Sequence, residues 1–165
     1  AQSGDDMILK RMKRRHSRAD TIAFCETVRR LRPDAAFSAD IITGFPTETE
    51  AMFQNSMTLV DEAGLSDLHV FAFSPRRGTP AARMPQLGAR VARERSARLR
   101  AKGEAARAAY FARLVGSTQP VLMERAGVGH TPCFAPVRFA DGVPGRIVAL
   151  RITGVAGSVL TGTPS

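Results

Sequence analysis

The stretch DIITGFPTETEAMF, residues 40–53, places a glycine turn between an apolar segment and a helix. In parallel α/β folds, ligands bind at the carboxyl ends of strands, and Gly44 lies at such an end in this pattern. The turn lacks the G-x-G-x-x-G spacing of a dinucleotide site and the G-K-S/T of a nucleoside triphosphate loop. It therefore predicts either a turn that binds another ligand or a structural turn in which Pro46 begins a helix.

Two further sets of residues have types that suit ligand chemistry. Arg76 and Arg77 lie in residues 74–80, SPRRGTP, where two guanidinium groups between prolines suit a phosphate or a carboxylate. A solvated loop explains the same residues equally well. Asp40 and His69 fall within apolar segments, so they either face the interior of a barrel or serve as hydrogen-bonded core residues.

The cysteines exclude some kinds of site. Cys25 and Cys133 are the only two, and they form no Cys-x-x-Cys pair or Cys/His cluster. This disfavours a disulfide scaffold and a self-contained zinc or iron–sulfur site. Cys25 recurs with Ile22, Val28 and Leu31 at helical spacing, which favours a small core residue over a nucleophile.

The elements that must position these residues alternate along the chain. Ser17 and Asp20 have the spacing of a capping box, and Pro33 follows the helix that they begin. Residues 36–43 are apolar on both faces, as buried parallel strands are, and residues 68–73 form a second apolar run. A helix from about residue 87 to 114 follows. The order helix, strand, helix, strand, helix predicts consecutive units of a parallel α/β sheet or barrel.

The connection between the two strands is predicted in more detail. Thr47 and Glu50 have the spacing of a second capping box, so a helix should follow the glycine turn. Gly64 lies where a glycine ends a helix in the left-handed conformation. Residues 1–16 read as a turn-like start followed by a basic run.

The composition changes at Gly116, which predicts a second unit. Short alternating segments between glycines and prolines suggest a small antiparallel barrel. We therefore expect two units, residues 1–115 and 117–165. Charged residues after Gly116 are Arg125, Arg138, Arg146, Arg151, Glu124 and Asp141.

The charge balance favours an anionic partner. The 165 residues include 24 Lys plus Arg, nearly all of them arginine, against 15 Asp plus Glu. Guanidinium pairs with phosphate, so nucleic acid is the leading partner class, although a GC-rich genome also enriches arginine. One basic cluster consists of Lys10, Arg11, Lys13, Arg14, Arg15 and Arg18, and the long helix carries Arg90, Arg93, Arg95, Arg98, Arg100, Lys102, Arg107 and Arg113.

The sequence also bears on location and on completeness. No segment approaches the roughly 20 apolar residues of a membrane span, and the N-terminus lacks the apolar core of a signal peptide. We expect a cytoplasmic, reduced protein with no membrane partner. The opening AQSGDDMILK has no start methionine, so we expect the chain to be a piece of a longer protein, cut by processing or by design.

Taken together, these segments resemble the MiaB-type radical-SAM methylthiotransferases. QSGDDMILKRMKRRH, DIITGFPTETEAMF, LHVFAFSPRRGTPAARMP and the terminal barrel occur in the order found in that family. The wording GDD-x-I-L-K-x-M-K-R-R-H with GFPTETE is most similar to the branch that modifies N6-threonylcarbamoyladenosine in tRNA. The branches that act on isopentenyladenosine and on a ribosomal protein are near neighbours.

The resemblance implies an α/β fold class and a role as the C-terminal part of such an enzyme. Residues 1–115 would be the C-terminal half of an open radical-SAM, TIM-like barrel, and residues 117–165 a small all-β TRAM barrel, OB-like and RNA-binding. The full-length enzymes use S-adenosylmethionine and two 4Fe-4S clusters, held by three cysteines of an N-terminal domain and by a Cys-x-x-x-Cys-x-x-Cys motif. Neither cysteine set occurs here, so no catalytic residue and no metal ligand is assigned in this chain.

The resemblance also implies cofactor contacts. Gln2 and Ser3 would close the fourth strand near the ribose or amino-acid end of S-adenosylmethionine. Residues 41–44 would pack against its adenine, with Ile42 and Gly44 as the assigned contacts, and Arg14 would pair with its carboxylate. The general pattern G-x-I-x-G-x-x-E is not matched, because an aspartate, residue 40, takes the first glycine position and a threonine, residue 47, takes the glutamate position.

The implied macromolecular partner is tRNA, through its anticodon stem-loop. Lys13, Arg15, Arg125 and Arg138 are the expected RNA contacts. Two alternatives stay open: a stand-alone RNA-binding module without catalysis, and the isopentenyladenosine branch of the family. The exposed edge of a half-barrel also predicts self-association, because unpaired strand edges seek partners.

Overall fold

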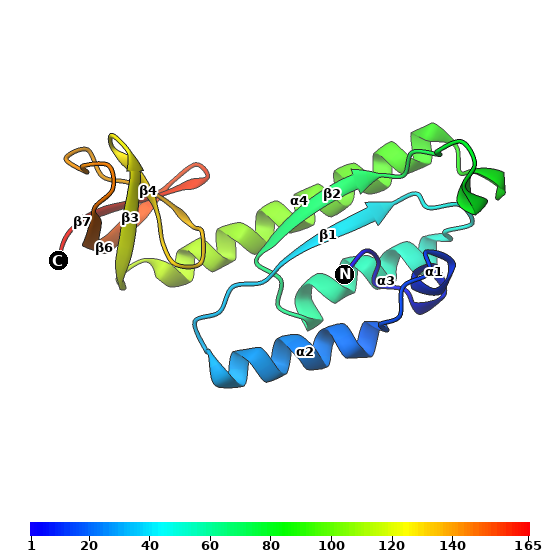
Figure 1. Ribbon diagram of the computed structural model, residues 1–165, viewed down its shortest axis with the longest axis horizontal. Helices are drawn as coiled ribbons and strands as arrows, with labels where there is room; N and C mark the ends of the chain where they lie inside the picture. The colour runs from blue at the N-terminus through cyan, green and yellow to red at the C-terminus, as the bar shows by residue number, and fades with distance from the viewer. The chain divides into compact units, whose positions relative to one another are not determined.

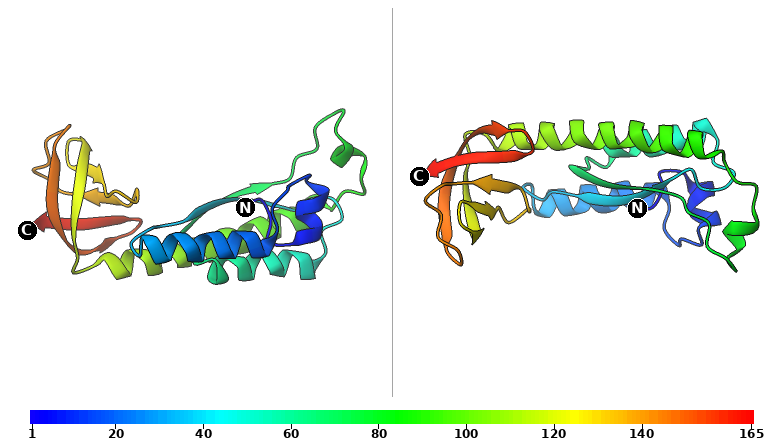
Figure 2. Two further views of the ribbon diagram at one scale, coloured as in Figure 1. Left: turned by 60° about the horizontal axis from the view of Figure 1, so that its bottom comes forward. Right: turned by 90° about the horizontal axis from the view of Figure 1, so that it is seen from above.

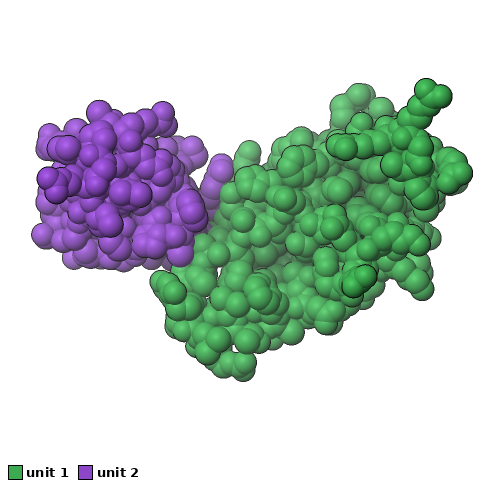
Figure 3. All heavy atoms as spheres, in the orientation of Figure 1, with its two compact units in different colours: residues 1–106 green, residues 107–165 purple.

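The structure, a computed structural model, describes all 165 residues and contains two compact units, residues 1–106 and 107–165 (Figure 3). The divide falls within the long helix α4 (Ala89–Leu114), ahead of the change in composition at Gly116. None of the helices combines the length and the apolar character needed to cross a membrane.

The first unit is a two-stranded parallel sheet with helices on one face (Figures 1 and 2). The parallel pairing runs in register from Ser38 opposite Asp67 to Thr43 opposite Ala72. The predicted alternation of helices and strands and the parallel pairing are therefore confirmed. The elements are α1 (Asp6–Arg11), α2 (Arg18–Leu31), β1 (Ser38–Thr43), α3 (Glu50–Glu62), β2 (Asp67–Ala72), the 3-10 turn η1 (Pro80–Arg83) and α4.

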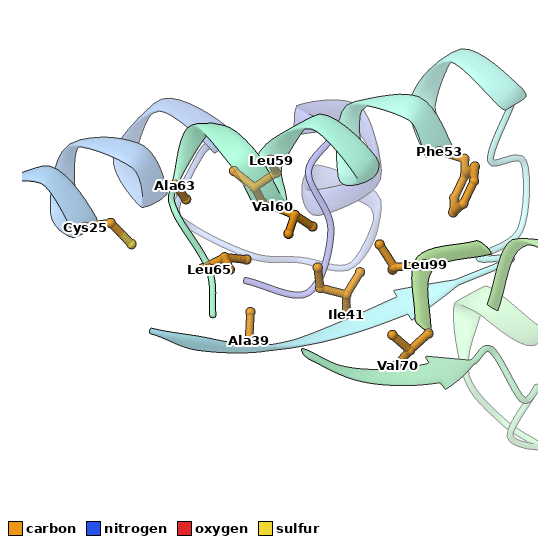
Figure 4. Close-up of a cluster of buried hydrophobic side chains, with 10 residues drawn as sticks. All are labelled: Cys25, Ala39, Ile41, Phe53, Leu59, Val60, Ala63, Leu65, Val70 and Leu99. Carbon is orange, nitrogen blue, oxygen red and sulfur yellow. The ribbon is translucent and has the colours of Figure 1, made fainter. Parts of the chain in front are cut away.

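The core of this unit lies between the sheet and the helices (Figure 4). Ala39, Ile41 and Val70 point from the strands toward Phe53 of α3 and Leu99 of α4, and all five are buried. The prediction that the first strand is buried on both faces is wrong, because side chains alternate along a strand and helices cover only one face. The other face is largely exposed.

Helix α2 begins and ends as the sequence predicts. Ser17 and Asp20 form a capping box, in which the Ser17 N–H donates to the Asp20 carboxylate at 2.8 Å. These hydrogen bonds from Ser17 hold the pKa of the Asp20 carboxyl below its usual value. Cys25 is buried in the core, and burial raises the pKa of its thiol, so the prediction of a core residue rather than a nucleophile is confirmed.

The start of α3 differs from the prediction, while its end agrees. Thr49, not Thr47, is the N-cap, and its hydroxyl accepts from the Met52 N–H at 3.2 Å. Thr47 has φ +69 and lies in the turn before the helix, so the predicted Thr47–Glu50 capping box does not form. Gly64 has φ +60 and ends the helix in the left-handed conformation, as predicted.

The N-terminal segment contains a helix, α1, where the sequence predicted only a turn and a basic run. Asp5 caps it by accepting from the Ile8 N–H at 3.0 Å. Lys13 then adopts φ +60, and the N–H groups of Lys13 and Arg14 bond back to carbonyls of the last turn at 3.0 and 2.9 Å. A helix this short is set by its caps rather than by periodicity, so the pattern gave no signal.

The start of the chain is fixed against α3. The Gly4 N–H donates to Ser56 Oγ at 2.9 Å. The Arg18 guanidinium donates to the Gly4 carbonyl at 2.9 Å and to Glu62 Oε1 at 2.7 Å. Arg18 is thus a structural bridge between the first residues, α2 and α3.

Other contacts reach the two outer edges of the sheet. The Ile42 N–H of β1 donates to the Gln2 carbonyl at 3.0 Å. Arg100 of α4 donates to the Val70 carbonyl of β2 at 3.1 Å. Both contacts satisfy backbone groups at the outer edges of the sheet, which have no neighbouring strand to bond to. Self-association through an exposed edge stays a prediction.

The second unit is a closed barrel with strand order β3-β4-β5-β7-β6. All neighbouring pairs are antiparallel except β5 and β7, which run parallel, so the barrel is confirmed but is not wholly antiparallel. Val121, Met123, Val137, Leu150 and Leu160 are buried. The strands are β3 (Thr118–Arg125), β4 (Val128–His130), β5 (Pro136–Arg138), β6 (Ile147–Ala156) and β7 (Val159–Pro164).

Replacing Gly4 with alanine tests the docking of the N-terminal segment on α3. An added Cβ would lie 2.3 Å from the Asn55 main-chain oxygen, so the segment must move. We expect Gly4→Ala to lower the free energy of unfolding by about 1–3 kcal/mol in chemical denaturation, the usual cost of overpacking. Gly88→Ala is the control, because a Cβ there meets nothing within 4 Å. Equal losses in the two variants would contradict the docking.

Candidate functional site

The turn that follows β1 is packed tightly against α4 and the end of β2. Gly44 has φ +70, and a Cβ on it would lie 2.6 Å from the Cβ of Ala92, so this position requires glycine. Phe45 is buried, and its ring lies edge-to-face on Phe73 with centroids 5.1 Å apart. The backbone at the carboxyl end of β1 is therefore held in one conformation.

Thr47 joins this turn to α1. Its backbone is in the left-handed region, where non-glycine residues are strained, and such strain tends to occur at functional sites. The Thr47 hydroxyl accepts from Arg11 Nη1 at 2.6 Å and donates to the Pro46 carbonyl. The basic segment that follows α1 is thereby placed at the same end of the sheet as the turn.

A buried ion pair closes the turn, and sequence reasoning missed it. Glu48 Oε2 accepts from the Gly44 N–H at 3.0 Å and from Arg95 Nη1 at 2.8 Å. Arg95 Nη1 also donates to the Glu48 carbonyl at 2.8 Å. The two side chains are 1% and 7% exposed, so solvent does not screen the pair. The only signal in the sequence was that Glu48 follows the turn glycine, Gly44, closely. It is the neighbour of Thr47, which takes the position of the family's glutamate.

The ion pair fixes geometry more than it adds stability. Burial raises the pKa of the Glu48 carboxyl, and the hydrogen bonds from Arg95 and Gly44 only oppose that rise. Desolvation of a buried pair often cancels its Coulombic gain, so such pairs contribute little net free energy. Because the bonds of Glu48 go to the turn and to α4, it acts as a positioning residue.

The start of the chain contains two predicted cofactor residues, Gln2 and Ser3, and brings Gln2 close to this turn. The Gln2 carbonyl accepts from the N–H of Ile42, two residues before Gly44. Gln2 Oε1 is buried and has no hydrogen-bond partner. Ser3 is also buried, but its hydroxyl accepts from the Asp5 N–H at 3.2 Å and lies 3.4 Å from Ser56 Oγ. Gln2 therefore has an unused polar atom, whereas the hydroxyl of Ser3 is engaged.

The uncovered face of the sheet carries polar and aromatic side chains. Asp40 lies opposite His69 in the register, and Ile42 lies opposite Phe71. Asp40, His69 and Phe71 are exposed, so the alternative that Asp40 and His69 are core residues is wrong. Opposite residues of paired strands share a face, which places a carboxylate, an imidazole and an aromatic ring on one surface.

Basic side chains approach the same end of the sheet from two segments. Lys13, Arg14 and Arg15 follow α1 and are exposed, and Arg76 and Arg77 are exposed on the loop after β2. Figures 1 and 2 show both segments at the end to which β1 and β2 point. Other members of the two basic clusters bond within the chain instead: Arg11, Arg18, Arg95, Arg98, Arg100 and Lys102.

The second unit places its two predicted RNA contacts in one row. Arg125 of β3 and Arg138 of β5 both pair with Val128 of β4 in the register. Both arginines are exposed on the outer side of the barrel. Val137, which precedes Arg138 in the chain, is buried in the barrel interior. The structure thus brings together two guanidinium groups that lie far apart in the sequence.

The chain holds no group of three or more His, Cys, Asp or Glu residues that suits a metal ion. Cys25 lies in the core of the first unit, and Cys133 belongs to the second. These residues do not fit the ligand set of an iron–sulfur cluster, which needs several thiolates in one place.

A double-mutant cycle tests the buried pair. Arg95→Ala alone should lower the free energy of unfolding by about 3–5 kcal/mol, because it leaves the buried Glu48 carboxylate without an ion-pair partner. Glu48→Ala should cost less, because Arg95 Nε still lies 3.4 Å from Glu50 Oε2. The double variant should cost clearly less than the sum, since neither charge remains. Lys102→Ala is the control: its pair with Asp61 is largely exposed and should contribute about 1 kcal/mol or less. Additive losses in the cycle would contradict the coupling.

Similarity to known proteins covers nearly the whole chain, although no protein-family model matches it. Threonylcarbamoyladenosine tRNA methylthiotransferase MtaB of Rickettsia prowazekii is 48% identical over 155 residues, which cover 93% of this chain and 37% of that protein. Two tRNA-2-methylthio-N(6)-dimethylallyladenosine synthases are also similar. That of Cereibacter sphaeroides is 40% identical over 98% of this chain and 39% of its own length. That of Erythrobacter litoralis is 39% identical over 98% and 38%.

The chain thus spans between a third and two fifths of the length of these relatives. The matches agree in kind, since each relative is named for adding a methylthio group to an adenosine of tRNA. The homologues of this chain over nearly its whole length are thus tRNA methylthiotransferases of the MtaB and MiaB types, and the chain corresponds to one part of them.

Proposed function

We propose that this chain is the C-terminal part of a radical-SAM tRNA methylthiotransferase that adds a methylthio group to C2 of N6-threonylcarbamoyladenosine at position 37 of tRNA. The observation that carries the proposal is the 48% identity to a relative named for that nucleoside. The relatives named for dimethylallyladenosine lie at 33–40%. Modification of that second nucleoside, the isopentenyladenosine branch, is the alternative within the family.

The proposed architecture is half of an open barrel followed by an RNA-binding barrel. We infer that residues 1–115 form the C-terminal half of a radical-SAM barrel. Support comes from the parallel pairing of β1 and β2, from helices on one face only, and from Gln2, which meets the free edge of β1 where a preceding strand would lie. Residues 117–165 would be the TRAM barrel, with which the closed five-stranded order agrees.

The residues at the turn fit S-adenosylmethionine as a ligand. Gln2 Oε1 is a buried oxygen without a partner, and the Gln2 carbonyl accepts from the N–H of Ile42, two residues before Gly44. Gln2 would bind the polar end of the cofactor, Ile42 and Gly44 would lie against its adenine, and Arg14 would pair with its carboxylate. The bound cofactor supplies the radical chemistry that activates an unreactive carbon, which no side chain provides. The Glu48–Arg95 pair would keep the adenine-binding turn in place.

The 4Fe-4S clusters have no ligands among these residues, so their cysteines would lie elsewhere in the protein. This keeps one different class of function open: an RNA-binding module without catalysis. The exposed arginines of this chain and its lack of cluster ligands favour the RNA-binding module. Iron and sulfide in the purified full-length gene product separate the two, since the enzyme requires both and the module neither.

Two surfaces are the proposed contacts for the anticodon stem-loop. The first consists of Lys13, Arg14 and Arg15, which are exposed at the carboxyl end of the strands, close to the proposed cofactor turn. The second is the row that contains Arg125 and Arg138 on the barrel. Phosphate contacts of this kind position an RNA without reading its sequence.

Removing charge after α1 tests the RNA-binding part of the proposal. Arg14→Ala together with Arg15→Ala should weaken binding of an anticodon stem-loop. The slope of log K against log salt concentration should become about 1–2 less steep, since each lost phosphate contact lowers its magnitude by about 1. Affinity measured at several salt concentrations gives both values.

The matched control is Arg30→Ala together with Arg32→Ala, which removes the same charge from the exposed end of α2. This pair should change the slope much less. The same flattening in both double variants, or none in either, would contradict a contact surface after α1.

A further inference from the structure

The connection between β4 and β5 ends in a hairpin loop of three residues, 132–134, between Thr131 and Ala135. The last residue of this loop, Phe134, has an unusual backbone conformation. The Thr131 N–H donates to the Ala135 carbonyl at 3.0 Å, and the Phe134 N–H donates to the Thr131 carbonyl at 2.9 Å. Phe134 has φ +60. Such loops place their third residue in the left-handed conformation, where glycine is the favoured residue.

A phenylalanine at this position is costly in two ways. Its Cβ clashes with the backbone in the left-handed region, which glycine avoids. Its side chain is 83% exposed, the highest fraction among the large hydrophobic residues of the chain. Exposed Leu122 and Ile147, by contrast, lie opposite each other in the β3–β6 register and can cover one another. Neither cost of Phe134 is offset by a ring contact within the chain.

Hydrogen bonds between Thr131 and Ala135 fix the loop, so the side chain of Phe134 projects from it. Thr131 is buried, and its hydroxyl accepts from the N–H of Ala135, itself buried, at 3.1 Å. Anchored on both sides, the loop presents Phe134 at the end of the β4–β5 hairpin. A rigid aromatic ring on a fixed backbone loses little conformational entropy when a partner binds it.

Two basic residues lie on the same side of the barrel as this hairpin, Arg138 on β5 and Arg125 on the neighbouring β3. Arg138 and Arg125 flank Val128 in the register, and the next outward row contains His130 opposite Pro136, after which the loop begins. Four positions of strand and loop separate Arg138 from Phe134, roughly 13 Å at the usual rise of a strand. Glu124 also reaches this surface, where its Oε2 lies 3.2 Å from His130 Nδ1. The surface therefore carries two cations and, further along the hairpin, an aromatic ring, and cations together with an aromatic ring are the combination that binds single-stranded nucleic acid.

We propose that Phe134 stacks on an unpaired base of RNA while Arg125 and Arg138 hold phosphates further along the same strand of RNA. This inference rests on the proposed function, and it specifies which part of the RNA the barrel recognises: an unpaired stretch, such as a loop, rather than a duplex. RNA is favoured over a protein partner because acidic residues of residues 117–165 are only Glu124 and Asp141, and arginines outnumber them.

Substitutions at Phe134 separate the ring from the backbone. Phe134→Gly removes the ring and relieves the left-handed strain, so it should unfold at the same or a higher denaturant concentration than wild type. It should nevertheless bind an unpaired oligoribonucleotide about 5- to 100-fold more weakly, the usual loss of one stacked base. The salt slope should stay unchanged, because no charge is removed. Fluorescence anisotropy of a labelled oligoribonucleotide, measured with the full chain, gives these values.

Phe134→Trp provides a direct readout of stacking, because the chain has no tryptophan. RNA should quench the fluorescence of this variant and bind it as tightly as wild type. Leu31→Trp is the control, since Leu31 is 74% exposed at the end of α2, outside both proposed RNA surfaces. Its fluorescence should not change on addition of RNA.

The outcomes separate this inference from the proposed function. Wild-type affinity in Phe134→Gly, or equal quenching in the two tryptophan variants, would overturn the stacking role and point to a partner other than RNA for the ring. The proposed function would survive that result if Arg14 and Arg15 were still required for binding. A wild-type chain with no affinity for RNA would overturn both.

Discussion

The buried ion pair between Glu48 and Arg95 fixes the part of the first unit on which the proposed site depends. It ties the turn after β1 to α4 through three hydrogen bonds at 2.8–3.0 Å. Because the pair is desolvated, breaking it costs more than forming it gains, so the turn has one stable arrangement. Gly44 lies inside that arrangement, and the Arg11–Thr47 bond then fixes α1 against it.

A second constraint is that parallel strands are normally covered on both faces. Here helices cover one face, and the other exposes Asp40, His69 and Phe71. In the proposed barrel this face would look inward, toward cofactor and substrate, which accounts for polar side chains on otherwise apolar strands. In that barrel the arginines after α1 would lie at the mouth, where a large anionic substrate would approach.

Local signals in the sequence predicted local structure well. The Ser17–Asp20 capping box, the helix-ending Gly64 and the parallel strands all follow from short patterns, and so does the small barrel. Two local predictions failed, since α1 was missed and the N-cap of α3 is Thr49 rather than Thr47. The other features that the sequence did not reveal depend on long-range contacts. Glu48 and Arg95 are 47 positions apart, and only packing brings them together. Gln2 and Gly44 were predicted as cofactor contacts by resemblance, and that role stays a prediction.

The central claim is that the protein containing this chain adds a methylthio group to threonylcarbamoyladenosine in tRNA. Mass spectrometry of nucleosides from total tRNA, taken from cells with the gene deleted and with it restored, tests this most directly. We expect deletion to remove the methylthio form of N6-threonylcarbamoyladenosine, to leave its unmodified parent in place, and to be reversed by the restored gene. Loss of the methylthio group from isopentenyladenosine instead, or no change in either nucleoside, would contradict the account.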